Sequence, residues 1–276
     1  MQREDERERE REVDLRAETA YLRLRLADSY MRNGKISRAI AEYKRAIKLD
    51  KQNGMFHTRL ADAYVMAEDI PSAMAFYQRA IQMDPLLAEP HSSIGDLYVR
   101  YGMNWHALEQ YREAVRLEPE RAFFRYQFGD MLERVGMSKQ ALEELTEAAL
   151  LAPKMAFYRF RLAVLYQQLD QQEEAYTHMC IACRVAPHDD YYLVRLAGLS
   201  MATDRRQDAV AYLRKAITLR PCNEGYQWLL AEAYRITGRQ DACEALCRRL
   251  GEINPYDEEF VTRRLGEWQL KAEFSM

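Results

Sequence analysis

The sequence predicts an all-α solenoid, a fold in which short helix pairs stack one on another along the chain. Three observations support this prediction. Small residues return every 34 residues, the apolar residues around them follow the helical period, and a proline closes most of the units. One such helix pair cannot bury its apolar face alone, whereas stacked pairs share a continuous core.

The repeat is clearest between Leu60 and Pro85, and the same pattern returns when the frame is shifted by 34 residues. If each unit is numbered from 1 to 34, position 8 is always alanine or glycine: Ala27, Ala61, Gly95, Gly129, Ala163, Ala197 and Ala231. Positions 20 and 27 are alanine in the first six units. Small residues let two helix backbones approach closely, and larger apolar residues at positions 7 and 11 fill the grooves between them. Each unit is therefore predicted to contain two helices.

Glycine and proline mark the predicted helix ends. Four units place a glycine between their two helices, where a left-handed cap favours it: Gly34, Gly102, Gly136 and Gly238. Position 32 is proline in the last six units, which stops the second helix before the next unit begins.

This helix-turn-helix pattern resembles the tetratricopeptide repeat. The resemblance implies a right-handed α-solenoid superhelix of seven repeats in residues 20–257, at 20–53, 54–87, 88–121, 122–155, 156–189, 190–223 and 224–257. The chain lacks the tryptophan that the family carries at position 4, and aromatic residues at position 3, such as Phe56 and Phe124, are expected to take its packing role. The last repeat departs most from the pattern, with Cys243, Cys247 and Leu250 at its seam positions.

The segments that flank the repeats differ in character. Residues 1–19 form a charged leader, for which we consider a frayed and solvated terminus, a solvated helix that runs into the first repeat, and a partner-docking arm. In residues 258–276, apolar residues recur at helical spacing, which predicts an amphipathic capping helix whose Trp268 covers the last repeat. A dimer contact is the alternative for Trp268.

Length and composition limit the classes of function. Seven repeats and two short flanks leave no room for a separate catalytic domain, so we expect neither an enzyme nor a cofactor. The net charge of −3 and the pI near 6.1 argue against a nucleic-acid partner, which normally needs a basic footprint. The sequence shows no membrane span and no secretory signal, and its five irregularly spaced cysteines fit a reducing compartment, so a cytoplasmic location is expected.

Aspartate recurs at position 9 of the first four repeats, and we call this set the acidic ladder: Asp28, Asp62, Asp96 and Asp130. The resemblance implies that the first helices line a concave groove through positions 2, 5, 9, 12 and 13. Arginines about one helical turn away favour internal ion pairs. The alternative is a row of carboxylates that receives backbone N–H groups or basic side chains of a bound peptide, and both roles can hold together.

Aromatic residues occupy groove positions 2 and 5 in the later repeats, and we call this set the aromatic stripe: Phe123, Tyr126, Phe157, Phe160, Tyr191 and Trp228. A single ring at helical spacing is usually a core residue, but an exposed apolar stripe marks an interaction surface. Burial of one ring is worth about 4–6 kcal/mol before other costs, against about 0.2–1 kcal/mol for an exposed ion pair. We therefore expect the stripe to supply binding energy and the ladder to set register and charge preference.

Two more specific sites do not fit the residues. The family's clamp for a terminal carboxylate needs asparagine at position 9, and the aspartate found there would repel a carboxylate. Arg161 and Arg195, both at position 6, remain candidates to meet a single acidic group beside the stripe. Cys180, Cys183 and His178 lack a fourth ligand nearby, so we expect no metal site.

The sequence therefore predicts a non-enzymatic scaffold or adaptor that binds a peptide or helix of another protein in the concave groove. The aromatic stripe would anchor an apolar segment, and the acidic ladder would prefer a basic or N–H-rich segment beside it. One alternative is a self-assembling structural module, a homo-oligomer in which the acidic groove receives a basic face of a neighbouring copy. The other is a regulatory subunit of a separately encoded enzyme.

Overall fold

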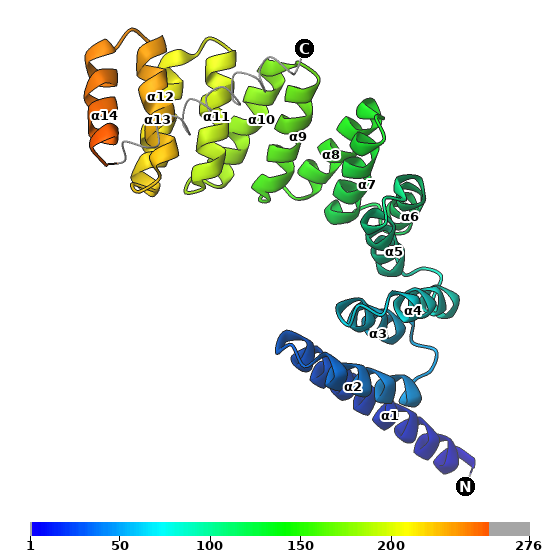
Figure 1. Ribbon diagram of the computed structural model, residues 1–276. Coiled ribbons are helices and arrows are strands. Elements are labelled where there is room, and N and C mark those ends of the chain that lie inside the picture. The colour runs from blue at the N-terminus through cyan, green and yellow to red at the C-terminus, as the bar shows by residue number, and fades with distance from the viewer. Residues whose placement is uncertain (1, 254–276) are drawn as a thin grey trace. The chain divides into compact units, whose positions relative to one another are not determined.

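The structure is a computed structural model that describes the backbone of residues 2–253 and the side chains of residues 14–250. Within residues 2–253 every regular element is an α-helix, which confirms the predicted fold class (Figure 1). The helices are α1 (Gln2–Arg32), α2 (Ile36–Leu49), α3 (Gly54–Met66), α4 (Ile70–Met83), α5 (Glu89–Arg100), α6 (Asn104–Leu117), α7 (Ala122–Arg134), α8 (Ser138–Leu151), α9 (Ala156–Gln168), α10 (Gln172–Val185), α11 (Asp190–Ala202), α12 (Arg206–Leu219), α13 (Glu224–Ile236) and α14 (Gln240–Ile253).

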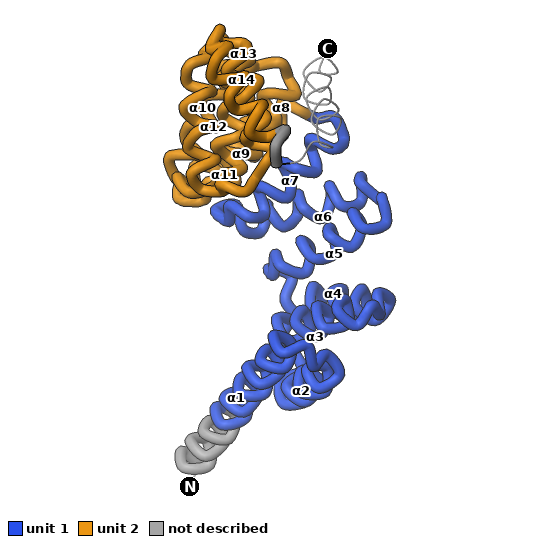
Figure 2. The backbone as a smooth tube through the Cα atoms, turned by 60° about the vertical axis from the view of Figure 1, so that its left-hand side comes forward, with its two compact units in different colours: residues 1–137 blue, residues 138–276 orange. Residues whose placement is uncertain are grey.

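The chain divides into two compact units, residues 1–137 and residues 138–276 (Figure 2). Unit 1 contains α1 to α7, and unit 2 contains α8 to α14. Within each unit, helices that follow one another in the sequence pack side by side, so that the helix pairs stack in order. The first helix of the fourth predicted repeat, α7, belongs to unit 1, and its second helix, α8, belongs to unit 2.

The small residues of the repeat lie inside the helix pairs. Every position-20 and position-27 alanine of the first six repeats is fully buried: Ala39, Ala46, Ala73, Ala80, Ala107, Ala114, Ala141, Ala148, Ala175, Ala182, Ala209 and Ala216. Phe56 and Phe124 at position 3 are buried as well, which confirms the packing role expected of them. A methyl side chain leaves room for the neighbouring helix, and the larger residues fill the space on either side.

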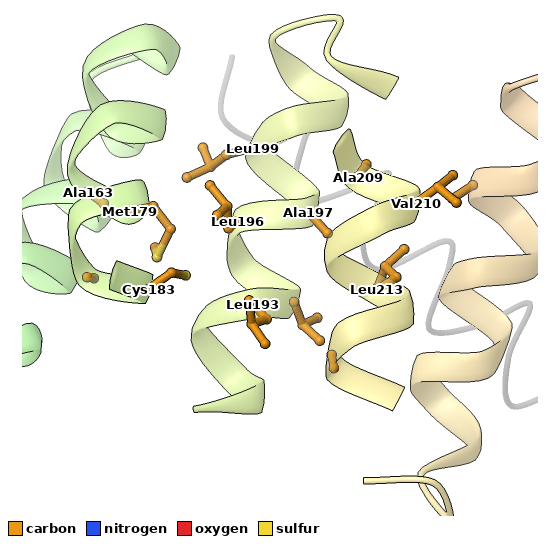
Figure 3. Close-up of a cluster of buried hydrophobic side chains, with 14 of the residues drawn as sticks. Ala163, Met179, Cys183, Leu193, Leu196, Ala197, Leu199, Ala209, Val210 and Leu213 are labelled. Atoms are coloured by element: carbon orange, nitrogen blue, oxygen red, sulfur yellow. The ribbon is translucent and has the colours of Figure 1, made fainter. Parts of the chain in front are cut away.

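Figure 3 shows this packing in unit 2. Leu196 and Leu199 of α11 point toward α10, where Met179 and Cys183 lie, while Ala197 on the same helix points toward α12. All five side chains are buried and belong to one hydrophobic cluster. Helix α11 therefore contributes large residues to one neighbour and a small residue to the other, as the 34-residue pattern predicts.

The charged leader is helical. Helix α1 begins at Gln2 and continues without a break into the first repeat, which favours the helical alternative over a frayed terminus. The predicted capping helix of residues 258–276, with Trp268, lies outside the described residues.

The turn between the two helices of each repeat places position 15 in the left-handed region. Glycine holds this position in four repeats, with φ between 69° and 83°: Gly34, Gly102, Gly136 and Gly238. The other three repeats place an acidic residue there, with φ of 58° to 60°: Glu68, Asp170 and Asp204. In the first repeat, the Gly34 N–H donates to the carbonyl oxygen of Met31 at 3.0 Å, and the Lys35 N–H donates to that of Tyr30 at 2.9 Å. This is a Schellman cap, and it confirms the predicted role of the glycines.

We predict that Glu68→Gly stabilises the protein and that Gly34→Ala destabilises it. A left-handed residue with a Cβ costs about 1–2 kcal/mol, while glycine adds about 0.5–1 kcal/mol of entropy to the unfolded chain. The expected changes in the free energy of unfolding are about +0.5 kcal/mol for Glu68→Gly and about −1 kcal/mol for Gly34→Ala, measured by urea denaturation. Asp170→Gly is the matched control and should gain less, because aspartate tolerates this conformation better. A loss of stability in Glu68→Gly would contradict the account.

Candidate functional site

Three of the four aspartates in the acidic ladder are held by a tyrosine of the same repeat. The position-9 carboxylate on the first helix accepts a hydrogen bond from the position-24 hydroxyl on the second helix. The pairs, each with 2.6 Å between the hydroxyl oxygen and Oδ1, are Tyr43 with Asp28, Tyr77 with Asp62, and Tyr111 with Asp96. Each bond therefore ties the two helices of one repeat together.

Burial changes the acidity of these groups. The pKa of each tyrosine hydroxyl is raised, first by burial and then by the neighbouring carboxylate, so the tyrosines stay protonated and donate. The pKa values of Asp62 and Asp96 are also raised, because burial outweighs the hydrogen bonds that favour their charged forms. Both carboxylates therefore sit in surroundings that stabilise negative charge less well than water does.

Positions 9 and 24 are aspartate and tyrosine in the first three repeats, and both lose these polar side chains in repeats five and six. Repeats five and six carry apolar residues or glycine at both positions: Val164 with Met179, and Gly198 with Leu213. In repeat four, Leu145 replaces the tyrosine, and the Arg134 Nε donates to Asp130 at 3.0 Å instead. An aspartate at position 9 thus has a partner of its own in every repeat where it occurs.

The ladder's partners differ from the expected arginines. An arginine partner is confirmed for Asp130, and Arg59 lies 3.8 Å from the carboxylate of Asp62 in a longer contact. The tyrosine partner was missed, although the sequence carries a signal for it. Tyrosine occupies position 24 in the first three repeats, in each of which position 9 is aspartate.

Gly95 shows how closely one of these tyrosines approaches the first helix. A Cβ placed on Gly95 would lie 2.6 Å from Cε1 of the Tyr111 ring, well inside van der Waals contact. The ring therefore packs directly against the backbone of α5. Glycine at position 8 makes room for the tyrosine that donates to the neighbouring Asp96.

Unit 1 contains a cavity of about 270 Å³, lined by residues of α3, α5 and α7 and of the turns before α5 and α7. The residues that face it come mainly from positions 2, 5, 6 and 9 of repeats two to four. They include the carboxylates of Asp62, Glu89 and Asp96 and the guanidinium groups of Arg59 and Arg121. The cavity therefore combines opposite charges on the face where the sequence predicted a binding groove.

The cavity unites three of the predicted site residues. Asp62, Asp96 and Phe123 all line it, whereas Asp28 and Asp130 of the acidic ladder do not. Phe123 is 46% exposed, so its ring is available at the surface of the cavity. Phe124, which the sequence assigned to packing, also lines it.

A buried glutamine fixes one side of the cavity. The Gln127 Nε2 donates to Oδ1 of Asp96 at 2.9 Å, and its Oε1 accepts from Oγ of Ser92 at 2.6 Å. Oδ1 of Asp96 thus accepts two hydrogen bonds, one from Gln127 of α7 and one from Tyr111 of α6. Gln127 was not predicted from the sequence, since its role depends on the meeting of helices from two repeats.

Arg121 is held on another side of the cavity. Its Nη1 donates to Glu89 at 2.7 Å and to Glu118 at 3.2 Å. Its guanidinium carbon also lies 4.4 Å from the centre of the Phe124 ring, a cation–π contact. The charge of Arg121 is therefore already balanced within unit 1.

The aromatic stripe is divided between the two units. Phe123 and Tyr126 lie on α7 in unit 1, and the other members lie on α9, α11 and α13 in unit 2: Phe157, Phe160, Tyr191 and Trp228. Tyr126, Phe160 and Trp228 are half-buried. The stripe is therefore described separately for each unit.

Phe160 is the centre of an aromatic cluster in unit 2. Its ring centroid lies 5.1 Å from that of Tyr192, 5.6 Å from that of Tyr191 and 6.4 Å from that of Phe157. Phe157 and Tyr191 nevertheless remain 37% and 48% exposed. The rings thus pack on one another, as expected for core residues, and still present an apolar surface. Tyr192 occupies position 3 of its repeat, where aromatic residues were expected to pack.

The two candidate arginines of unit 2 are half-buried. The Arg195 Nη2 donates to Oε1 of Gln167 on α9 at 2.8 Å, so it joins the first helices of two neighbouring repeats. Arg161 lies on α9 next to Phe160 in the sequence. Their role toward an acidic group stays a prediction.

The surroundings of the cysteines of α10 favour a structural role for them. Burial raises the pKa of the Cys183 thiol to about 12, and the His178 ring stacks on Tyr166 at 5.2 Å between centroids. Among residues with described side chains, no three histidine, cysteine, aspartate or glutamate side chains converge as metal ligands.

None of the described helices is long and apolar enough to cross a membrane.

The raised pKa of Asp62 predicts a pH-dependent effect of Asp62→Asn. A carboxyl group whose pKa is higher in the folded than in the unfolded state binds its proton more tightly when folded, so its contribution to stability increases as pH falls. Asparagine keeps an acceptor for Tyr77 but does not titrate. We expect the free energy of unfolding of Asp62→Asn minus that of the wild type to be largest near pH 7 and to decrease toward pH 4. Urea denaturation at both pH values tests this, and a constant difference would contradict the burial argument.

Two segments of the chain match family models. Residues 24–88 and residues 191–222 each match a model described as tetratricopeptide repeat. The first segment lies in unit 1 and the second in unit 2. No curated protein sequence matches the chain.

Solved structures with the same fold include three with informative descriptions. The C-terminal part of a TPR repeat-containing protein from Cytophaga hutchinsonii is 17% identical, with a TM-score of 0.69, and the match covers 86% of this chain and 97% of that one. Pseudomonas aeruginosa pilF is 16% identical, with a TM-score of 0.60 and coverage of 79% and 98%. YrrB, described as a TPR protein with an unusual peptide-binding site, is 22% identical, with a TM-score of 0.56 and coverage of 70% and 97%. The chain thus contains segments at residues 24–88 and 191–222 that match the tetratricopeptide repeat family, and its helix pairs share the fold of these solved structures.

Proposed function

We propose that this protein is a non-enzymatic adaptor that binds a peptide or helix of another protein on the faces of its first helices. Tetratricopeptide repeats commonly serve as protein-interaction modules, and YrrB, which shares the fold, is described as having a peptide-binding site. The observation that carries the proposal is the aromatic cluster of unit 2. Phe157 and Tyr191 stay exposed there although neighbouring rings support them.

The arrangement of these rings suits binding of an apolar segment. Phe160 packs against both rings and limits their motion. Binding of a ligand would therefore cost little side-chain entropy. Large, rigid aromatic residues dominate the energy of many protein interfaces for this reason. Unit 1 adds a polar face, because its cavity contains fixed carboxylates beside Phe123. The net charge of −3 favours a protein partner over a nucleic acid.

We predict that the double variant Phe157→Ala, Tyr191→Ala weakens binding of peptides that the wild type selects from a phage-displayed random 12-residue library. The expected loss is about 10- to 30-fold in Kd, because truncation of one or two aromatic anchors typically costs this much. Fluorescence anisotropy with the selected peptides measures the change, and circular dichroism checks the fold.

Leu150→Ala is the matched control for this experiment. Leu150 is also a large exposed apolar residue of unit 2, but it lies on α8, the second helix of its repeat. This variant should bind as the wild type does. Equal affinity of the double variant and the wild type for every selected peptide, with the fold intact, would refute the role of the aromatic cluster.

Self-assembly is a second candidate function, and α1 favours it. Leu15 and Leu22 are both exposed and lie seven residues apart, on the same side of the helix. A second copy of α1 could bury both. Light scattering over a range of concentrations tests this candidate, since a constant monomeric mass would exclude it.

A further inference from the structure

We propose that the cavity of unit 1 is a specificity pocket for a single lysine or arginine side chain of the bound peptide. The inference rests on the proposed function, since the side chain must be presented by a segment bound along the first helices. The inference adds the kind of ligand side chain that the cavity selects. Three features of the cavity support the proposal: its charge, its unused hydrogen-bonding capacity and its size.

The charged groups of the cavity leave a negative excess. Asp62, Glu89 and Asp96 contribute three carboxylates, against the two guanidinium groups of Arg59 and Arg121. The charge of Arg121 is neutralised by Glu89 at 2.7 Å and by Glu118 at 3.2 Å, and Glu118 does not line the cavity. The charge that remains for a ligand is therefore that of Asp62 and Asp96, which Arg59 offsets only through its 3.8 Å contact with Asp62.

Asp96 is the carboxylate best placed to receive a cation. Both of its hydrogen bonds arrive at Oδ1, from the Tyr111 hydroxyl at 2.6 Å and the Gln127 Nε2 at 2.9 Å. Among the residues with described side chains, none donates to its Oδ2 and no lysine or arginine pairs with it. Asp96 lines the cavity, so a ligand in the cavity can reach its carboxylate.

The neutral donors hold this carboxylate in place without cancelling its charge. Tyr111 and Gln127 fix the orientation of Asp96, and burial raises the pKa of its carboxyl despite these two hydrogen bonds. A preorganised carboxylate of this kind offers charge-assisted hydrogen bonds to an ammonium or guanidinium group. The ligand therefore does not have to order the side chain that it binds.

The size and the apolar lining fit one long basic side chain. At about 270 Å³ the cavity is smaller than the roughly 300–1,000 Å³ typical of small-molecule sites. Met55, Leu87 and Phe123 also line it, and such residues pack well against the methylene groups of lysine or arginine. The exposed ring of Phe123 is in addition a suitable cation–π partner.

The decisive experiment uses the full-length protein and peptides that it selects from a phage-displayed random 12-residue library. We expect the selected set to include peptides with lysine or arginine at one fixed position. Replacement of that residue by norleucine, which keeps an aliphatic chain but removes the charge, should weaken binding about 10- to 100-fold. The double variant Asp62→Asn, Asp96→Asn should lose the same factor and should no longer distinguish lysine or arginine from norleucine.

Asp28→Asn provides the matched control. Asp28 occupies the same repeat position and accepts the same tyrosine hydrogen bond, but it does not line the cavity. Asparagine retains an acceptor for the tyrosine at all three positions, so the helix pairs should stay intact, as circular dichroism can check. Asp28→Asn should keep the wild-type preference for lysine or arginine.

The outcomes separate this inference from the proposed function. Selected peptides that carry no fixed lysine or arginine, or that bind the double variant as well as the wild type, would overturn the pocket and leave the adaptor proposal standing. If Asp28→Asn loses the preference equally, the effect belongs to the tyrosine–aspartate bonds and the pocket is again overturned. Failure to select any peptide would overturn both proposals.

Discussion

The close approach of two helices is the constraint on which the whole structure depends. Alanine at positions 20 and 27 is fully buried in each of the first six repeats, and position 8 is alanine or glycine throughout. An added methylene group in such a seam would push the helices apart and cost about 1–3 kcal/mol. Because the helix pairs within each unit stack on one another, such a displacement would also alter the next interface. The faces of the first helices keep their geometry only while these seams stay narrow.

The tyrosine–aspartate bonds add a polar connection to this apolar seam. They join positions 9 and 24 in the first three repeats, and each hydrogen bond to a charged group is worth about 1.5–3 kcal/mol. The bond also determines which side of the aspartate stays available, because it occupies Oδ1. One contact therefore stabilises a helix pair and orients a carboxylate on the surface where a ligand is proposed to bind.

Period and composition predicted the helices, the left-handed glycines and the buried seam, because these features depend on neighbours a few residues away in one repeat. The tyrosine partner of Asp62 was harder to predict, since it lies on the other helix of the pair and competes with nearby arginines. The cavity was harder still. It requires Asp62, Asp96 and Phe123 from three first helices to face the same space, and Gln127 to reach back to Asp96. Such contacts depend on how helix pairs stack, which a single repeat does not determine.

Positions 9 and 24 give the two units different surface chemistry on one scaffold. In the first three repeats, the aspartate at position 9 accepts a hydrogen bond from a tyrosine of the second helix, which leaves a fixed negative charge on the first helix. In repeats five and six, residues without charge at both positions remove that charge, and the rings around Phe160 become the prominent feature. The exchange leaves the alanine seam unchanged, so it alters what the surface can bind without altering how the helices pack. A repeat protein can thus acquire a charge-selective segment and an apolar segment by substitution at two positions of the repeat.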